Sequence, residues 1–147
     1  MIKLSKKIEY ALLAIQFISA SPKKQVTAKE ISDSLGISFE FLSKTLQQLI
    51  KSGIVLSAQG TKGGYVLDKN PESITVADII DAIEGKHPLV NCLEKDDPTS
   101  CERSDNCSIR HSISDIQTQI ENVFNNITIA EMAKINFQNN ANQITTG

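Results

Sequence analysis

The amino-acid sequence predicts a mainly α-helical fold with one small β-hairpin and a long helix towards the C-terminus. Apolar residues recur at steps of three and four in several segments, which is the spacing of an amphipathic helix. Two short β-type runs flank a glycine-rich turn at GTKGG, which is typical of a hairpin. Further along, apolar residues keep heptad spacing through nearly three heptads, which indicates a helix that pairs with another helix.

Length and composition indicate one main domain with an appendage. At 147 residues, the chain is long enough for one hydrophobic core but too short for two ordinary domains. Hydrophobic residues make up 40% and charged residues 22%, and no apolar run approaches the roughly 20 residues that cross a bilayer. Glu9 and Gln16 interrupt the apolar N-terminus, so we do not interpret it as a signal peptide. We expect a cytoplasmic protein that does not bind membranes.

The first third of the chain predicts three helices. Residues 5–20 place apolar side chains at helical spacing. The second helix begins after Thr27, which forms a capping-box pattern with Glu30, and it ends at Gly36. Ser38 is suited to cap a third helix with an inward stripe of leucines. A helix, a tight glycine turn and a second helix form a helix-turn-helix.

A hairpin follows the third helix directly. Its predicted strands are 54–58 and 65–68, and a further helix is predicted over 75–83. This order is that of a winged helix-turn-helix, in which the third helix enters the major groove and the hairpin, called the wing, touches phosphate or the minor groove. We therefore predict that residues 1–85 form a winged helix-turn-helix DNA-binding domain.

The remaining residues predict a loop, a long helix and a tail. Residues 86–107 lack periodicity and are rich in Pro, Asp, Ser and Asn. Residues 108–135 are predicted to form a dimerisation helix and a C-terminal helix, and residues 136–147 a flexible tail. Burial of the heptad seam in its own domain is one explanation, but its narrow width and polar flanks favour pairing between two subunits in a homodimer. The seam consists of Ile109, Ile113, Ile116, Ile120, Val123 and Ile127.

Charge is segregated along the chain, although the net charge is only −2. Residues 1–69 contain ten lysines and five acidic residues, a net charge of +5; residues 70–147 contain five basic and twelve acidic residues, a net charge of −7. Chance variation of a solvated surface would also give such a difference, but a basic half with a helix-turn-helix indicates a polyanionic partner. Aromatic residues make up only 5%, too few for a stacking platform for single strands. Double-stranded DNA is the expected partner.

All three cysteines, Cys92, Cys101 and Cys107, lie in the stretch CLEKDDPTSCERSDNC. In a reducing cytosol, a closely spaced odd set is more typical of a metal or redox site than of disulfides. Thiolates are the usual ligands of iron-sulfur clusters, and three cysteines with one histidine also form structural zinc sites. The spacings exceed those of a typical zinc knuckle, which favours a cluster. Zinc and metal-free reactive thiols are the alternatives.

This order of motifs resembles the IscR- and NsrR-type iron-sulfur winged-helix transcription regulators of bacteria. The resemblance covers about residues 1–135, and its most specific parts are LSKKIEYAL, GISFEFLSKTLQQLIKSGIV, GTKGGYVL and the three cysteines. It implies a homodimeric repressor or activator that holds a [2Fe-2S] or [4Fe-4S] cluster on these cysteines and a fourth ligand. It also implies that redox conditions, nitric oxide or cluster status changes the affinity for DNA.

The resemblance implies candidates for the fourth ligand. In NsrR-like members an acidic residue on the first helix of the other subunit completes the site, and Glu9 occupies the matching place. In IscR-like members a histidine follows the third cysteine by three residues, whereas His111 follows Cys107 by four. A four-residue step still keeps both side chains on one helix face. We favour Glu9, with His111 as the alternative and His87 as a weaker candidate; a solvated surface role competes with each.

Eight residues are candidate DNA contacts. Polar side chains opposite the leucine stripe of the third helix are expected to face outward, where Gln, Lys, Glu and Phe have base-edge partners. A lysine lies at the tip of the wing, and glutamine stands where many IscR-like relatives place an arginine, which argues against deep minor-groove insertion. A solvated helix face is the simpler reading of the same residues. The candidates are Ser38, Phe39, Glu40, Ser43, Lys44, Gln47, Gln59 and Lys62.

Other function classes fit the sequence less well. An electron carrier would use the cysteine segment but would leave the helix-turn-helix and the wing without a role. A cysteine hydrolase would need an oxyanion site and a substrate cleft, which no motif indicates. We therefore predict a regulator that is not an enzyme and binds no small-molecule substrate. A two-fold dimer would bind a near-palindromic DNA site.

Overall fold

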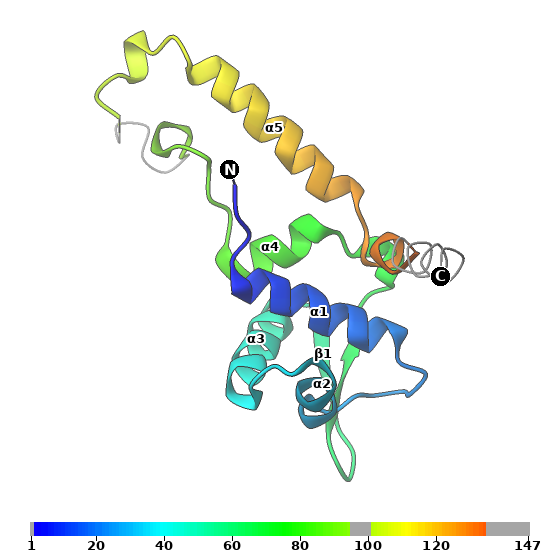
Figure 1. The fold of residues 1–147 in the computed structure, drawn as a ribbon. Coiled ribbons are helices and arrows are strands. Elements are labelled where there is room, and N and C mark those ends of the chain that lie inside the picture. The colour runs from blue at the N-terminus through cyan, green and yellow to red at the C-terminus, as the bar shows by residue number, and fades with distance from the viewer. Residues whose placement is uncertain (1, 95–100, 135–147) are drawn as a thin grey trace, which may run out of the picture.

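The computed structural model describes residues 2–94 and 101–134 (Figure 1). It confirms the predicted mainly α-helical fold with one antiparallel hairpin. The predicted tail, 136–147, lies outside the described residues, as do residues 95–100 of the cysteine segment. The elements are α1 Lys6–Ala20, α2 Ala28–Leu35, α3 Phe39–Lys51, β1 Val55–Ala58, β2 Gly64–Leu67, η1 Pro71–Ser73, α4 Val76–Glu84, η2 Asn91–Leu93, η3 Ser104–Asn106 and α5 Arg110–Asn126. Residues 129–134 form a further helical segment.

The helix-turn-helix begins and ends at the predicted caps. The hydroxyl of Thr27 accepts a hydrogen bond from the Glu30 N–H at 3.1 Å, and the Glu30 carboxylate accepts one from the Thr27 N–H at 2.8 Å. Gly36 ends α2 with φ 65°, a left-handed conformation that glycine adopts without steric cost. The hydroxyl of Ser38 then accepts from the Phe41 N–H at 3.3 Å. These local bonds fix the short turn between α2 and α3.

The hydrophobic core lies between α1, α3, α4 and the start of β1. Leucines of α3 fill its centre on the inward stripe that the sequence predicts. The stripe turns the opposite, polar side of α3 towards solvent. The largest fully buried side chains are Ile8, Ile15, Ile31, Leu42, Leu46, Leu49, Val55, Ile74, Ile79 and Ile129.

The wing is a hairpin of β1 and β2 in register from Val55 opposite Leu67 to Ala58 opposite Gly64. The first strand begins one residue later than the predicted range 54–58, and the second is shifted by one residue at both ends from the predicted range 65–68. The chain between α1 and α2 forms an isolated antiparallel β-bridge with β2. There the N–H of Val26 donates to the Tyr65 carbonyl at 3.1 Å, and the N–H of Tyr65 donates to the Val26 carbonyl at 2.8 Å. The wing is thereby attached to the helical domain along β2.

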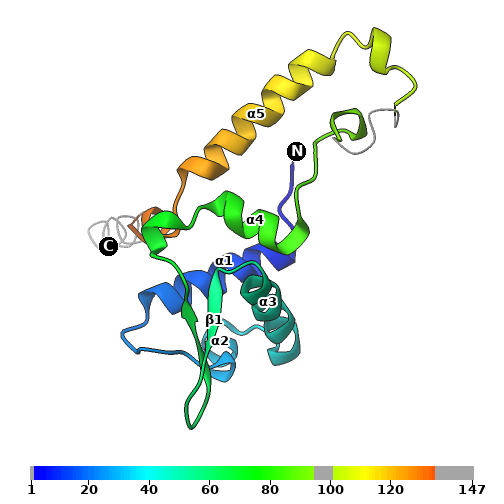
Figure 2. The same ribbon diagram turned by 180° about the vertical axis from the view of Figure 1, so that it is seen from behind.

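Helix α5 runs past α4, and its N-terminal end carries the cysteine segment away from the helix-turn-helix (Figures 1 and 2). At its other end the chain returns to the core, because Thr128 forms an antiparallel bridge with Thr75. The N–H of Ile129 donates to the Ile74 carbonyl at 2.9 Å, and the Ile129 side chain is only 1% exposed. The bridge and the buried isoleucine fix the C-terminal end of α5 to the start of α4.

We expect Ile129→Ala to lower the free energy of unfolding by about 2–5 kcal/mol, the usual range for truncating a fully buried isoleucine. Denaturant unfolding at one fixed protein concentration measures this change. Leu13→Ala is the control, because Leu13 is 41% exposed on α1 and its truncation should change stability by less than about 1 kcal/mol. Equal, small effects of the two substitutions would show that the end of α5 is not part of the core.

Candidate functional site

The predicted DNA-reading residues of α3 lie together on its solvent side. Phe39, Glu40, Lys44 and Gln47 are exposed and Ser43 is half-buried, while the leucine stripe faces the core. Phe39, at the first position of α3, is 56% exposed. The N-terminal half of α3 therefore presents polar groups and one exposed ring on the same side of the helix.

Three of the candidates at α3 already have partners within the chain. The ammonium group of Lys44 lies 3.1 Å from the Glu40 carboxylate, and both side chains are strongly exposed. An exposed pair of this kind contributes little to stability, so Lys44 can exchange the carboxylate for a phosphate at small cost. Ser38 uses its hydroxyl as the cap of α3. Its first role is therefore structural.

The wing supplies the other two candidates. Gln59 and Lys62 are both exposed. Gln59 precedes, and Lys62 lies within, a turn in which the Gly63 N–H donates to the Gly60 carbonyl at 3.2 Å. Gly63 has φ 65°, the left-handed position that commonly follows a type I turn in a hairpin. No carboxylate within the described ranges forms an ion pair with Lys62. Its ammonium group is open to an anionic partner.

Another lysine of the basic half is neutralised within the chain. Lys23 donates a side-chain hydrogen bond to the Glu30 carboxylate. This bond, together with the bond from the Thr27 N–H, lowers the pKa of Glu30 to about 2. The carboxylate is therefore ionised throughout the physiological pH range, and Lys23 adds less to the positive field of this half than its sequence position suggests.

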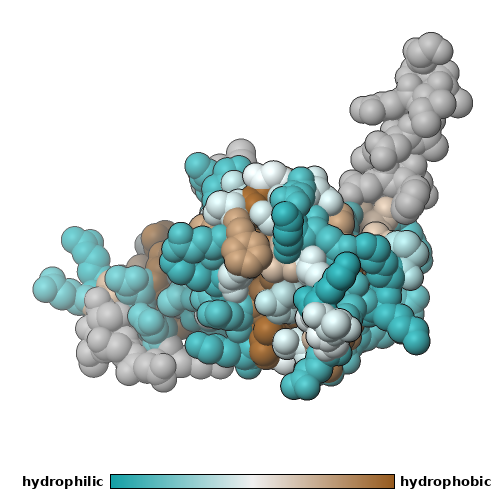
Figure 3. Space-filling view, turned by 90° about the horizontal axis from the view of Figure 1, so that it is seen from below, coloured by the Kyte–Doolittle hydropathy of each residue, from teal (hydrophilic) through white to brown (hydrophobic). Residues whose placement is uncertain are grey.

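The face that carries α2, α3 and the wing is mainly hydrophilic. Figure 3 views the molecule from this side, and the polar side chains surround only a small apolar area near the middle. Polar and positively charged groups around a few apolar contacts are typical of surfaces that bind the DNA backbone and the edges of bases. This face is the candidate nucleic-acid interface.

The cysteines lie at the opposite part of the molecule. Cys92 in η2 is 9% exposed, Cys101 and Cys107 are half-buried, and all three are free thiols. The guanidinium group of Arg110 donates to the Cys92 carbonyl at 3.4 Å, which ties η2 to the first turn of α5. Both views place η2 and η3 near this end of α5 (Figures 1 and 2). The structure therefore gathers the thiol-bearing turns at one end of a long helix.

The donor set suits a soft metal centre, because three thiols without disulfide partners are the ligands that iron-sulfur clusters and zinc prefer. Within residues 2–94 and 101–134, no three His, Cys, Asp or Glu side chains lie close enough together to hold a metal ion. The argument for a cluster at this place therefore depends on the chemistry of the three thiols and on their position in one segment of the chain.

The candidates for the fourth ligand lie on different elements. Glu9, in the first turn of α1, lies 2.5 Å from the Lys6 ammonium group, and this hydrogen bond is the main reason why the pKa of Lys6 is raised. His111 is exposed in the first turn of α5, and His87 is exposed between α4 and η2. Chain continuity places His111 nearest to Cys107, whereas Glu9 lies on the helix that starts beside the segment leaving α4 (Figures 1 and 2).

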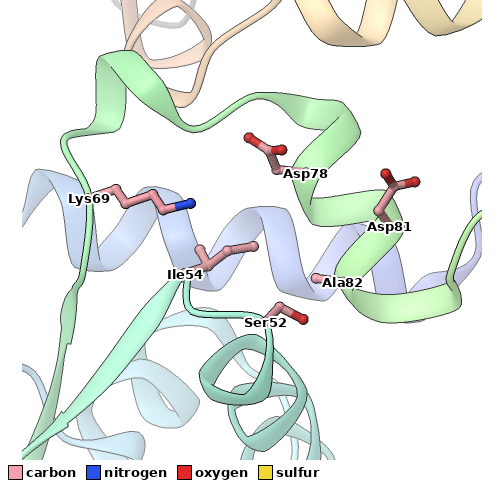
Figure 4. Close-up of a pocket in the computed structure, with 6 residues that line it drawn as sticks. All are labelled: Ser52, Ile54, Lys69, Asp78, Asp81 and Ala82. Atoms are coloured by element: carbon pink, nitrogen blue, oxygen red, sulfur yellow. The ribbon is translucent and has the colours of Figure 1, made fainter.

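A small pocket of about 230 Å³ lies between the end of α3, the start of β1 and α4 (Figure 4). Its two carboxylates have intramolecular roles. Asp78 caps α4 by accepting from the Thr75 N–H at 2.9 Å, and Asp81 lies 3.7 Å from the Lys86 ammonium group. The pocket contains none of the predicted site residues.

Sequence reasoning missed one residue at the candidate interface. Gln25, in the connection between α1 and α2, donates from its side-chain amide to the Gly63 carbonyl in the wing at 3.3 Å. A single polar residue in a short connection has no periodicity that would reveal such a contact.

Comparison with known proteins identifies the family. Residues 4–135 match the Rrf2 family, described as iron-dependent transcriptional regulators. The chain is 31% identical over 131 residues to the HTH-type transcriptional regulator IscR of Yersinia enterocolitica, which covers 88% of this chain and 78% of that protein. No helix in the described part of the chain is long and apolar enough to span a membrane.

Solved structures agree with this match. CymR, the global cysteine regulator of B. subtilis, aligns with a TM-score of 0.72 and 27% identity over 92% of this chain and 98% of its own. IscR of T. potens aligns with a TM-score of 0.70 and 29% identity over 90% and 87%. These relatives are regulators and not enzymes, as the sequence predicts for this protein. With its DNA-binding fold and a match over almost its whole length, the chain belongs to the Rrf2 family of transcriptional regulators.

Proposed function

We propose that the protein is a homodimeric regulator of near-palindromic DNA sites whose affinity is controlled by an iron-sulfur cluster. One observation mainly supports the cluster: three free thiols lie in one segment at the N-terminal end of α5, in a family described as iron-dependent. The relatives named IscR support the same assignment. Cys92, Cys101 and Cys107 would hold the cluster, with Glu9 of the second subunit or His111 as the fourth ligand.

The cluster would supply a centre that is sensitive to redox conditions and to small reactive ligands, and either a [2Fe-2S] or a [4Fe-4S] form is compatible with three thiolates and one other donor. A carboxylate or imidazole is a harder ligand than a thiolate and suits a soft iron-sulfur centre less well, so it is displaced more easily. The three cysteines would therefore retain the cluster while the fourth position makes the site responsive.

Dimerisation is supported by the exposed apolar residues of α5. Ile109, Ile116 and Val123 are 60%, 45% and 55% exposed and lie one heptad apart, so they form one line along the helix. The other seam positions, Ile113, Ile120 and Ile127, are half-buried. In the single chain the seam is thus only partly covered, and the same helix of a second copy would cover the remainder.

A thiol-based regulator is the second candidate. The structural similarity to CymR, named as a cysteine regulator, supports it, as does the partial exposure of Cys101 and Cys107. Structural zinc on the same residues is a further alternative, because zinc prefers the same thiolate donors. Metal and sulfide content of protein purified without oxygen separates these cases: equal iron and acid-labile sulfide supports the cluster, zinc alone supports the structural site, and neither after reconstitution supports metal-free thiols.

DNA binding is tested by lysine substitution. We expect Lys44→Ala and Lys62→Ala each to weaken binding to DNA selected from a random duplex pool. The slope of log affinity against log salt should fall by about one for each lost phosphate contact. Lys86→Ala is the matched control, since Lys86 is also an exposed lysine, is paired with Asp81 and lies outside the candidate interface. A slope that stays unchanged in a salt titration would remove that lysine from the interface.

A further inference from the structure

We infer that Gln25 is a positioning residue that holds the tip of the wing in place for its contact with DNA. The inference rests on the proposed DNA-binding function and adds to it a residue outside α3 and the hairpin. Gln25 is half-buried in the connection between α1 and α2, 38 positions before its hydrogen-bond partner in the wing. The backbone of the adjacent Val26, the side-chain amide of Gln25 and the aliphatic stem of Gln25 each contact the hairpin.

The backbone brings this connection against β2. Val26 and Tyr65 exchange two hydrogen bonds, at 3.1 and 2.8 Å, and Val26 is only 2% exposed. Because Val26 is anchored in the core and paired with β2, the backbone of the neighbouring Gln25 is held beside β2. The position of Gln25 is therefore set by the core as well as by the wing.

The side-chain amide of Gln25 contacts the turn directly. Its Nε2 donates to the carbonyl of Gly63 at 3.3 Å. Gly63 also closes the turn, since its N–H donates to the Gly60 carbonyl at 3.2 Å. Lys62 lies between these two glycines, and the bond from Gln25 restrains the Gly63–Gly64 peptide, one residue beyond the lysine.

The two neighbouring glycines leave room for the Gln25 side chain. A Cβ atom on Gly64 would lie 3.1 Å from both Cβ and Cγ of Gln25, and one on Gly60 would lie 3.2 Å from its Nε2. Both distances are tighter than ordinary van der Waals contact. The stem of Gln25 thus packs against the base of the wing, and its amide lies below the tip.

This packing matters because a two-stranded hairpin is marginally stable in water on its own. A mobile tip would have to be ordered when Lys62 binds phosphate, and ordering lowers affinity. The contact with Gln25 already orders the tip in the free protein, so less affinity is lost to ordering when DNA binds. Gln25 therefore acts through Lys62 and does not itself need to touch DNA.

Gln25→Met tests the inference, because methionine keeps a stem of similar length and removes the amide donor. Loss of one such hydrogen bond should weaken binding to the selected DNA about 2- to 10-fold. The melting temperature should change little, and amide hydrogen exchange at Lys62 and Gly63 should become faster. In a Lys62→Ala background the same substitution should have no further effect on affinity.

Gln48→Met is the matched control, since Gln48 makes a similar bond, to the Ile83 carbonyl at 3.4 Å, away from the wing. It should change neither wing exchange nor affinity. An equal loss of affinity from Gln25→Met with and without Lys62 would overturn the inference, as would unchanged exchange in the wing. If the wild-type protein binds no selected duplex, both the proposed function and this role of Gln25 fail. If the wild-type protein binds DNA but the losses of affinity from Gln25→Met and Lys62→Ala are additive, only the role of Gln25 fails.

Discussion

Replacing Cys107 by serine is expected to abolish the iron-sulfur cluster while leaving the fold intact. Cys107 is half-buried between η3 and α5 and is not part of the hydrophobic core, so its loss should hardly change the unfolding midpoint. A serine hydroxyl is a harder and much weaker ligand than a thiolate. Because changes to outer-shell partners alone cost about 10- to 100-fold in metal affinity, loss of a ligand should lower iron and sulfide content at least as strongly.

The matched control is Ser108→Ala, next in the chain, which changes a side chain of similar size without removing a thiol. Iron, sulfide and the visible absorption spectrum are measured on protein purified without oxygen. Cys92→Ser should also lose the cluster but should in addition destabilise the fold, since Cys92 is 9% exposed. A Cys107→Ser protein that retains wild-type iron and sulfide would contradict the proposed site.

The same measurement separates the candidates for the fourth ligand. Glu9→Ala should release the cluster more readily than His111→Ala if the carboxylate of α1 completes the site. Glu9 also pairs with Lys6 in an exposed ion pair, but such a pair contributes little to stability, so a loss of cluster in Glu9→Ala would not reflect unfolding. The reverse order would assign the ligand to the first turn of α5.

The winged-helix region was predictable from the sequence because its signals are local. Thr27 with Glu30, and Thr75 with Asp78, form capping boxes within three residues of each other, and the leucine spacing of α3 identifies its buried side. Turn residues at GTKGG marked the hairpin to within one residue at its ends. Each signal is complete within a few positions, so no knowledge of distant contacts is needed.

The contacts between distant segments were not predictable in this way. The Val26–Tyr65 and Thr75–Thr128 bridges each involve a single residue on either side, which leaves no alternating pattern to detect. Gln25 gives no signal for the same reason. The cysteine site is different: its donors are plain in the sequence, but the described residues do not bring three possible ligands together.

A charge in the exposed line of α5 is expected to convert the protein to monomers. We expect Ile116→Glu to raise the dimer dissociation constant by more than about 30-fold, because it removes a central apolar contact of the seam, for which hot-spot residues cost about 2 kcal/mol or more, and buries an unpaired charge. Ile116 is 45% exposed and no side chain of α5 is fully buried in the single chain, so the substitution should leave the fold of the monomer intact. Analytical ultracentrifugation over a concentration series measures the change.

Thr118→Glu is the control, since residues 116 and 118 are about 200° apart on a helix and Thr118 is exposed. It adds the same charge to the same helix on the side away from the seam, and it should leave the dimer unchanged.

The monomeric variant also tests how the dimer seam and the cysteine site are linked. If Glu9 of one subunit completes the cluster of the other, Ile116→Glu should lose iron and sulfide together with the dimer. If His111 is the ligand, the cluster should persist in the monomer, and only binding to a two-fold DNA site should fall. Loss of the dimer in both glutamate variants would instead show that α5 tolerates no added charge, and would leave the seam without a special role.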